Sequence, residues 1–565
     1  MNGTHAVIRL NDFGIKPDSG EDAAVAIRMA IGEMARIGGP VVFTCDPGRY
    51  DLYPEHAAKA CYPVSNTASE VENPDATKTI GIRLQGLRNV TLDGNGSLFV
   101  FHGKQTMIVV DGCEDVSIRN LRLDYERPTV TEMTVERIGE NFIDAVVHKD
   151  SRYELENGAL TWVGEGWRFR DGPMQEYDPL TNTTWRIGNI VMAAARIEER
   201  EPGRLRLIYA EGWLPQTAVG RVFQARDGIR DQVGALIVGS RKVAWRDFGV
   251  HFMHGLGLVC QFSEDVTFER MELAPRADTG RTAAAFADCI HASGCRGLIR
   301  VANSRFAGAH DDVINVHGTY LRVAEQPSED ELILRFMHPQ TYGFPAFFAG
   351  DVIAFVRSES LISYGEAVVE EAELVEPRVM RIKLDRRPPK QLRAGDVIEN
   401  VTWTPEVEIV GNRMARIPTR GILVTTRRRA LIEGNFFERM TMSAVLVACD
   451  ASSWFESGIV TDLTIRGNSF LECGHEDAAV ISISPEIATA EEGLYVHSGI
   501  TIEGNRFDMC NAPLLEAGCS EGLIFANNLI VGADRGGEAG AVIRLAACDK
   551  VSIVNNRYTW QSAQG

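Results

Sequence analysis

A short phrase recurs through the C-terminal part of the chain and constrains the fold more than any other feature. Each copy is a run of alternating apolar residues that ends in Gly-Asn or Asn-Asn, as in VEIVGNRM (407–414) and LTIRGNSF (463–470). Successive copies lie 23, 33, 37, 22 and 29 residues apart, counted at Asn412, Asn435, Asn468, Asn505, Asn527 and Asn556. Short intervals of 22 or 23 residues mixed with longer ones are typical of a coil of constant perimeter that carries inserted loops.

The phrase predicts a strand followed by a corner. Its β-branched residues favour a strand, and Gly or Asn permits the left-handed bend that a corner needs. Asparagines at one place in every coil can also stack into a hydrogen-bonded ladder. The sequence therefore predicts an all-β fold, a parallel β-helix whose coils stack in one direction. A β-sandwich or a propeller is the alternative, although propeller blades repeat more evenly, at roughly 40–50 residues.

The rest of the chain divides around this solenoid. Residues 18–39 begin with Asp-Ser, carry apolar residues at helical spacing and end at Gly-Gly, which predicts a helix that caps the first coil. Two stretches with other strand patterns interrupt the coils, and the second contains the near-duplicates AGDVIAFV and AGDVIENV. We therefore expect two inserted β-barrel-like modules. The predicted parts are the cap and first coils (1–127), a first module (128–226), central coils (227–318), a second module (319–400) and C-terminal coils (401–565).

Charge and hydropathy exclude several classes of partner. The net charge is −19 with a pI near 5.2, and no basic run carries interleaved aromatic residues. Nucleic acid is therefore not expected to bind, and a neutral ligand such as a sugar suits this charge better. No long run of apolar residues occurs, so no membrane partner is expected. The N-terminal MNGTHAVIRLNDFG lacks the features of a signal peptide, which predicts a cytoplasmic protein, or a secreted one if a leader has been removed.

Two stretches with aspartates are one coil apart. AFADCIHASG (285–294) aligns with GAHDDVINVHG (308–318), and Asp312 follows Asp288 by 24 residues. Residues one coil apart in a solenoid stack at the strand spacing of about 4.8 Å. Asp288 is therefore expected to lie directly beneath the adjacent pair Asp311 and Asp312.

These aspartates are predicted to sit at a corner beside a polar groove. An ionised carboxylate in the apolar core is too costly, so each aspartate is expected just before its strand begins. Carboxylates that converge on a cleft suit glycoside hydrolysis, which needs one protonated acid and one base or nucleophile. Neighbouring negative charges raise one pKa and so supply the acid. There are three alternatives: a solvated turn, a calcium site at the aspartates, or a metal site at His251 and His254.

The same stretches resemble a known family. GAHDDVINVHG with the upstream ADCIH is similar to glycoside hydrolase family 110, the α-1,3-galactosidases that remove terminal galactose from blood-group-B-type glycans. The resemblance implies a right-handed β-helix with inserted barrel modules, a homodimer, and inverting hydrolysis without a metal or other cofactor. It implies that Asp288 is the general acid and that Asp311 and Asp312 hold and activate the water. Further motifs that carry the resemblance are FMHPQTYGF (336–344), PTRGILVTTRRRALIEGN (418–435) and DASSWFESG (450–458).

Five more residues are candidates for binding the substrate, a galactose-terminated oligosaccharide. Asn315 and His317 are predicted to point outward on the strand that follows the aspartates, where they would contact the sugar. Trp454 could stack on galactose and Glu456 could accept hydrogen bonds from its hydroxyls, although Trp454 could equally pack under a loop. Arg420 follows Pro-Thr at a corner, where it binds the sugar or forms a surface ion pair.

Two other functions fit a β-helix. A polygalacturonase shares the solenoid and the carboxylates, but its family pattern pairs an Asn-Thr-Asp triplet, which does not occur here, with an Arg-Ile-Lys triplet. A uronate substrate would also favour a basic groove, whereas this chain is acidic. A carbohydrate-binding β-helix without catalytic activity explains the repeats but not three aspartates one coil apart.

Overall fold

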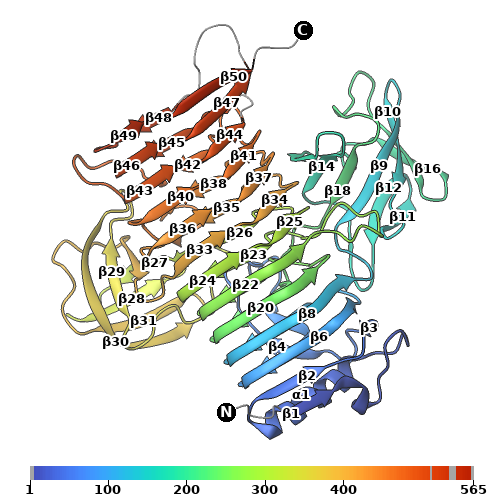
Figure 1. Ribbon diagram of the computed structural model, residues 1–565, viewed down its shortest axis with the longest axis horizontal. Helices are drawn as coiled ribbons and strands as arrows, with labels where there is room; N and C mark the ends of the chain where they lie inside the picture. Colours follow the sequence, from blue (N-terminus) through green and yellow to red (C-terminus); the bar gives the residue numbers. More distant parts are fainter. Residues whose placement is uncertain (1–5, 509–511, 534–542, 562–565) are drawn as a thin grey trace.

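The chain folds into one long solenoid of stacked strands (Figure 1). The computed structural model describes residues 6–508, 512–533 and 543–561. Its two main sheets contain 21 and 13 strands, and nearly all neighbouring strands in them are parallel. The fold is therefore the right-handed parallel β-helix that the repeats and the resemblance predict. The first five residues, on which the prediction about a signal peptide partly rests, lie outside the described residues.

The 13-stranded sheet carries the site described below. Most of its strands are short and follow one another coil by coil, so side chains at equivalent positions stack in columns. Its strands are β4 (Ala58–Cys61), β5 (Thr77–Gln85), β7 (Thr106–Asp111), β19 (Ala235–Val238), β21 (Leu258–Gln261), β23 (Ile290–Ser293), β26 (Ile314–Thr319), β35 (Ile422–Val424), β38 (Val445–Val447), β42 (Ile481–Ile483), β45 (Leu515–Gly518) and β48 (Ile543–Ala546), with β39 (Glu456–Ser457) paired onto β26.

The 21-stranded sheet forms the other walls of the solenoid. Its early strands are long, and the later coils replace each long strand by two short ones with a bend between them. The early strands include β6 (Arg88–Phe101), β8 (Glu114–Tyr125), β20 (Arg241–Val250) and β22 (Glu264–Leu273); the later pairs include β33 (Glu406–Val410) with β34 (Arg413–Ala415) and β36 (Ala430–Glu433) with β37 (Phe436–Glu438).

An asparagine ladder runs through these bends, as the repeated phrase predicts. Asn412 Nδ2 donates to Asn435 Oδ1 at 3.0 Å, and the same contact continues through Asn468, Asn505, Asn528 and Asn556. The sequence count is wrong by one residue at the fifth copy. Asn527 takes the left-handed bend, with φ of 56°, and Asn528 occupies the ladder. The intervals on either side of this copy are therefore 23 and 28 residues.

A single α-helix covers the first coil, as expected. Helix α1 (Ala24–Ile37) begins where Asp22 Oδ1 accepts the N–H of Ala24, and it ends at Gly38, whose φ of 65° is left-handed. Its buried side chains, among them Ile27 and Met34, join the apolar core of the solenoid. Within the described residues, no helix is long and apolar enough to cross a membrane.

The first module leaves the solenoid after β8 and returns before β19. It consists of a seven-stranded antiparallel sheet and a three-stranded one with their own apolar core. The seven strands, in spatial order, are β15 (Thr183–Ile187), β14 (Met174–Asp178), β18 (Val222–Ala225), β9 (Thr131–Ile138), β10 (Phe142–Val147), β17 (Arg204–Ile208) and β16 (Arg196–Glu201); the three are β11 (Arg152–Glu156), β12 (Ala159–Val163) and β13 (Arg168–Phe169).

The second module is a closed six-stranded barrel that begins directly after β26. The near-duplicate stretches supply two of its strands, β29 and β32, which pair antiparallel. In the view of Figure 1 the two modules lie on opposite sides of the solenoid. In order around the barrel the strands are β27 (Leu321–Glu325), β28 (Glu331–Arg335), β31 (Val379–Leu384), β30 (Ser363–Glu376), β29 (Val352–Val356) and β32 (Val397–Asn400).

Candidate active site

The two aspartate stretches stack one coil apart, as their spacing predicts. Strand β23 pairs in parallel with β26, with Ile290 opposite Ile314, and an isolated bridge joins Ala285 to Ala309. The offset of 24 residues therefore holds through the segment that contains Asp288 and Asp312. Both aspartates precede their strands by two residues and are buried, with 4% and 2% of their surface exposed.

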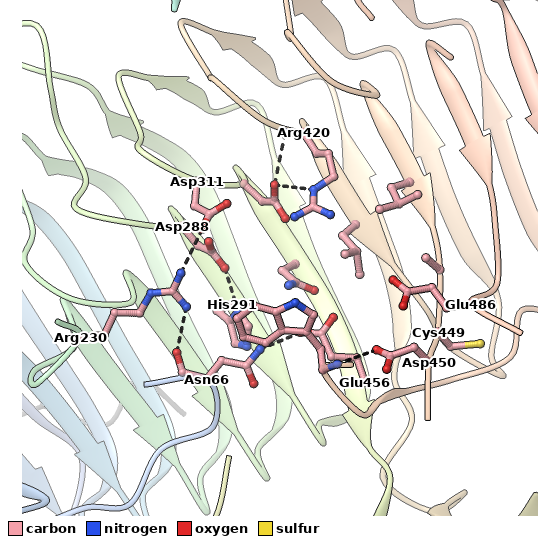
Figure 2. A pocket seen from close by; sticks show the side chains of 16 residues that line it. Asn66, Arg230, Asp288, His291, Asp311, Arg420, Cys449, Asp450, Glu456 and Glu486 are labelled. Atoms are coloured by element: carbon pink, nitrogen blue, oxygen red, sulfur yellow. Dashed lines mark hydrogen bonds and ion pairs between the residues drawn. The ribbon is translucent and has the colours of Figure 1, made fainter. Parts of the chain in front are cut away.

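The aspartates open into a pocket on the outer face of the 13-stranded sheet (Figure 2). Its volume is about 90 Å³, which is room for several water molecules. Seven of the eight predicted site residues line it: Asp288, Asp311, Asp312, Asn315, Arg420, Trp454 and Glu456. The pocket also contains residues that sequence reasoning did not select, namely Asn66, Arg230, His291, Leu423, Leu446, Ala448, Cys449, Asp450 and Glu486.

His317 is the predicted residue that the structure places elsewhere. Its ring is 2% exposed and lies against His291, so it does not line the pocket. The outward direction of the strand side chain is as predicted, but the end of β26 is covered. Strand β39 pairs there in antiparallel orientation, and Ser457 lies opposite Gly318. A Cβ at Gly318 would lie 2.3 Å from Ser457 Oγ, so any other residue here would require the Ser457 hydroxyl to move.

Segments from distant parts of the sequence wall the pocket. Asn66 comes from the connection between β4 and β5, and Arg230 from the link between the first module and β19. Arg230 Nη1 donates to the carbonyl oxygen of Asn66 at 3.0 Å, which ties the two segments together. Asn66 Nδ2 donates to Glu456 Oε1 at 2.7 Å. Neither segment carries a motif, and only the tertiary fold brings them to the aspartates.

Arginines surround the adjacent pair. Asp311 accepts from Arg186 Nη2 through Oδ1 and from Arg230 Nη2 through Oδ2, each at 3.0 Å. Burial alone would raise the pKa of the Asp311 carboxyl, but the charges of Arg230 and Arg186 hold that pKa below its usual range. Arg186 lies on β15 of the first module, so that module takes part in the site. Asp311 is therefore an ionised carboxylate at neutral pH.

Asp312 has a weaker positive environment. Arg420 Nε donates to its Oδ1 at 2.8 Å. Burial raises the pKa of Asp312, Arg420 opposes that rise, and the charges of Asp311 and Asp288 add to it, so that the pKa reaches about 6. Arg420, proposed from its position at a corner as a sugar ligand or a surface ion pair, thus forms a buried ion pair with an aspartate of the site.

Asp288 has no arginine partner within hydrogen-bond distance among the described residues. Burial raises the pKa of its carboxyl, and the negative charge of Asp311 raises it further, to about 8. Its Oδ2 lies 2.9 Å from Nδ1 of His291, and burial holds the pKa of that imidazole well below its usual range. At neutral pH the pocket therefore contains a protonated carboxylic acid one coil from an ionised carboxylate.

The other end of the pocket is formed by a tight loop. Asp450 accepts hydrogen bonds from the backbone N–H groups of Ser452, Trp454 and Phe455 at 3.0–3.2 Å, and also from that of Ser453. The loop places Trp454 against His338 of the second module, with ring centroids 4.3 Å apart and an interplanar angle of 28°. Asn315 also lines the pocket, and within the described residues its buried Oδ1 has no hydrogen-bond partner.

Two alternatives from the sequence can be located. His251 Nδ1 lies 2.9 Å from the carbonyl oxygen of Ala274, whereas His254 Nε2 lies 2.6 Å from Asp231, so these rings have separate partners. In the part of the chain that the structure describes, no three His, Cys, Asp or Glu side chains are arranged to hold a metal ion. An Arg-Ile-Lys triplet does occur, at residues 381–383, but it lies on barrel strand β31 and does not line the pocket.

Comparison with known proteins decides the family. Residues 131–222 and 331–398 match the family models described as GLAA-B beta-barrel domain I and GLAA-B beta-barrel domain II. The chain is 43% identical to Alpha-1,3-galactosidase A of Bacteroides thetaiotaomicron, over 96% of this chain and 95% of the relative. It is 40% identical to Alpha-1,3-galactosidase A of Bacteroides fragilis, over 93% and 87%. The chain belongs to the α-1,3-galactosidase family. It is therefore a member of a glycoside hydrolase family, as the resemblance of its motifs implies.

One further relative and one solved structure show lower identity. The identity to Alpha-1,3-galactosidase A of Akkermansia muciniphila is 36%, over 87% of this chain and 81% of the relative. The crystal structure of PfbA, a surface adhesin of Streptococcus pneumoniae, aligns with a TM-score of 0.45 and 12% identity, over 98% of this chain and 90% of that one. A similarity this low carries no conclusion about function.

Proposed function

We propose that the protein is an exo-acting α-1,3-galactosidase that releases terminal galactose from blood-group-B-type or linear Galα1-3Gal glycans. The observation that carries the proposal is one pocket with an uncharged Asp288 one coil from an ionised Asp311, in a chain of this family. The names of the relatives support the linkage and the sugar. A polar pocket that includes one exposed tryptophan face is suited to a neutral monosaccharide.

The proposed reaction inverts the anomeric centre and needs no metal. Asp288 donates its proton to the glycosidic oxygen as the bond to the anomeric carbon breaks. Asp311 and Asp312 orient a water on the opposite face of the ring and take its proton as its oxygen attacks that carbon. The arginines support this assignment because they keep Asp311 ionised, and an ionised carboxylate is the form that can accept a proton.

Four residues are proposed to hold the galactose. Trp454 offers one ring face to the sugar, since His338 covers the other. Asn315 Oδ1 has no protein partner among the described residues and is free to accept from a sugar hydroxyl. Glu456 is positioned by Asn66 for the same purpose. Arg420 acts chiefly through Asp312, which it holds, and direct contact with the sugar is secondary.

The test is the reaction itself, followed by proton NMR. Purified protein incubated with Galα1-3Gal and with the fucosylated B trisaccharide is expected to release β-galactose first, before mutarotation. Initial α-galactose would contradict inversion but keep the hydrolase. Binding of either glycan without release of galactose would instead support a carbohydrate-binding β-helix without activity, and cleavage of polygalacturonate would support the pectinase.

Assembly and location stay predictions. The homodimer rests on the resemblance, and light scattering that gives only the mass of one 62.2 kDa chain at micromolar concentration would contradict it. Cytoplasmic location, with imported oligosaccharides as substrates, is tested by fractionating the native host.

A further inference from the structure

Two buried histidines, His291 in the wall of the pocket and His317 behind it, have no role in the acid and base steps described above. His291 and His317 are 1% and 2% exposed, and their Nε2 atoms lie 2.9 Å apart. The other nitrogen of His291 faces Asp288 Oδ2 at 2.9 Å. The other nitrogen of His317 faces the carbonyl oxygen of Gly318 at 2.6 Å. The four groups form one unbranched chain from a backbone carbonyl to the proposed acid.

The hydrogen positions along this chain follow from its fixed end. The Gly318 carbonyl can only accept, so His317 must carry its hydrogen on Nδ1. In a neutral imidazole the other nitrogen is then bare, and His317 Nε2 must accept. His291 therefore donates from Nε2, and its Nδ1 is bare. That bare nitrogen faces Asp288 Oδ2, so the hydrogen between them must belong to the carboxyl group.

The opposite arrangement requires a buried cation. If Asp288 were ionised, His291 Nδ1 would have to donate to it, and one of the two rings would carry hydrogens on both nitrogens as an imidazolium. Burial holds the pKa of His291 well below its usual range, which opposes the charge on that ring. If His291 Nε2 instead accepts from His317, the imidazolium is His317. The carboxylate nearest to its Nε2 is Glu456 Oε1 at 3.5 Å, which already accepts from Asn66. Burial of that charge without a hydrogen-bonded counterion is costly.

We propose that His291 and His317 are positioning residues that hold the acid proton on Asp288 until the glycosidic oxygen of the substrate competes for it. This inference deepens the proposed function and rests on it. The other charged groups that face Asp288 act in both directions: Asp311 and Glu456 favour the protonated acid, and Arg230 and Arg420 oppose it. The histidine pair adds a directional contact. The bare Nδ1 of His291 accepts a hydrogen bond from the protonated acid and has no hydrogen to donate to the carboxylate form.

The first experiment measures the pH profile of kcat/KM for His317→Leu. Without the fixed acceptor, His291 is free to place its hydrogen on Nδ1 and to donate to an ionised Asp288. The basic limb of the profile should therefore move to lower pH by about one unit, which is a loss of roughly tenfold at pH 8 relative to pH 6. The matched control is His497→Leu, because His497 is also fully buried and does not line the pocket. A basic limb in His317→Leu that coincides with that of His497→Leu would overturn the proposal.

A second measurement is made on the wild-type protein. Nitrogen-15 NMR of histidine-labelled wild-type protein at pH 7 distinguishes the two neutral tautomers, and spectra of the variants assign the signals. We expect hydrogen on Nε2 of His291 and on Nδ1 of His317. Hydrogen on Nδ1 of His291 would overturn the proposal even if His317→Leu fails to fold. Failure of the proposed function is separate, because wild-type protein would then release no galactose while the tautomers could still be determined.

Discussion

Asp288 and Asp311 are the same kind of residue in the same pocket, one coil apart, and their hydrogen-bond partners differ. Asp311 is held between two arginines, whereas Asp288 faces a neutral histidine. Both are shielded from water, so burial pushes both pKa values upward. The arginines reverse that push at Asp311, whereas at Asp288 the charges of Arg230 and Arg420 oppose the push without reversing it. The difference between an acid and a base in this pocket is thus set by the neighbours, which is the general way in which paired carboxylates divide their roles.

The two environments also have different origins in the chain. Both histidines of the chain that ends at Asp288 lie on solenoid strands, His291 on β23 opposite Asn315 and His317 on β26 opposite Ser293. The arginines at Asp311 come from outside the coils, Arg186 from the first module and Arg230 from the link that follows it. The acid environment is therefore local to two consecutive coils, whereas the base environment exists only once the module has docked. The predictions below test this division.

The largest expected effect comes from removing either carboxylate. Asp288→Asn and Asp312→Asn should each lower galactose release by about 10²–10⁴-fold, because one removes the proton donor and the other part of the water-holding pair. Circular dichroism and gel filtration serve as the folding control. More than about a tenth of wild-type activity in either purified variant would contradict the assignment of that residue.

The two arginines at Asp311 allow a graded comparison. Arg230→Gln should lower activity by about ten- to a hundredfold and move the acidic limb of the pH profile to higher pH, because the pKa of Asp311 rises when a positive neighbour is lost. Arg186→Gln should move the same limb by less, since the Arg186 side chain is 53% exposed and that of Arg230 only 13%. Arg230→Gln should also move the basic limb to higher pH, because Arg230 opposes the protonated form of Asp288, whereas Arg186→Gln should leave that limb in place. A larger shift for Arg186→Gln would contradict the ranking.

Removal of the Asp288 carboxyl and removal of the Asp311 carboxyl should change stability at alkaline pH in opposite directions. The folded-state pKa of Asp288 is raised, so its stabilising contribution is present at low pH and is lost as pH rises toward about 8. The folded-state pKa of Asp311 is lowered, so its contribution is present at neutral and alkaline pH and is lost as pH falls. At pH 8, Asp288→Asn should therefore melt a few degrees above the wild type, and Asp311→Asn below it.

Differential scanning fluorimetry at pH 5 and pH 8 checks both signs. The advantage of Asp288→Asn should shrink at pH 5, where the wild-type carboxyl already holds its proton. Equal shifts of the two variants at pH 8 would show that the two carboxyl groups do not differ in charge state.

The sequence predicts the surroundings of Asp288 better than those of Asp311, because the former lie on two consecutive coils and the latter come from outside the coils. The 24-residue register between Asp288 and Asp312 is readable because each coil repeats the last, and the structure confirms it. Arg230 and Asn66 carry no pattern, since their places depend on how two irregular segments cross over the sheet. His317 illustrates a further limit: strand parity gives the direction of its side chain, but the pairing of β39 that covers it is not visible in the sequence. The repeated phrase predicts Asn527 as the ladder residue in place of Asn528, because two adjacent asparagines satisfy the same phrase.

The smallest effect on activity is expected at that ladder, and it isolates stability from chemistry. Asn528→Ala removes the acceptor of Asn505 N–H and Nδ2 and the donor to Ile502, and it should cost about 1–3 kcal/mol locally. Because solenoid coils unfold from their ends, hydrogen exchange should speed up in the coils around Asn505 and beyond. Asn527→Gly is the matched control, since the neighbouring Asn527 is exposed and outside the ladder, and glycine adopts its left-handed φ of 56° without strain. It should leave the exchange of these coils closer to wild type.

Both variants should keep both limbs of the pH profile at wild-type positions, because neither asparagine lines the pocket. A shift of either limb would mean that loss of stability alone can imitate the effects assigned to Asp288 and Asp311. The contrast between these two carboxyl groups would then lose its support.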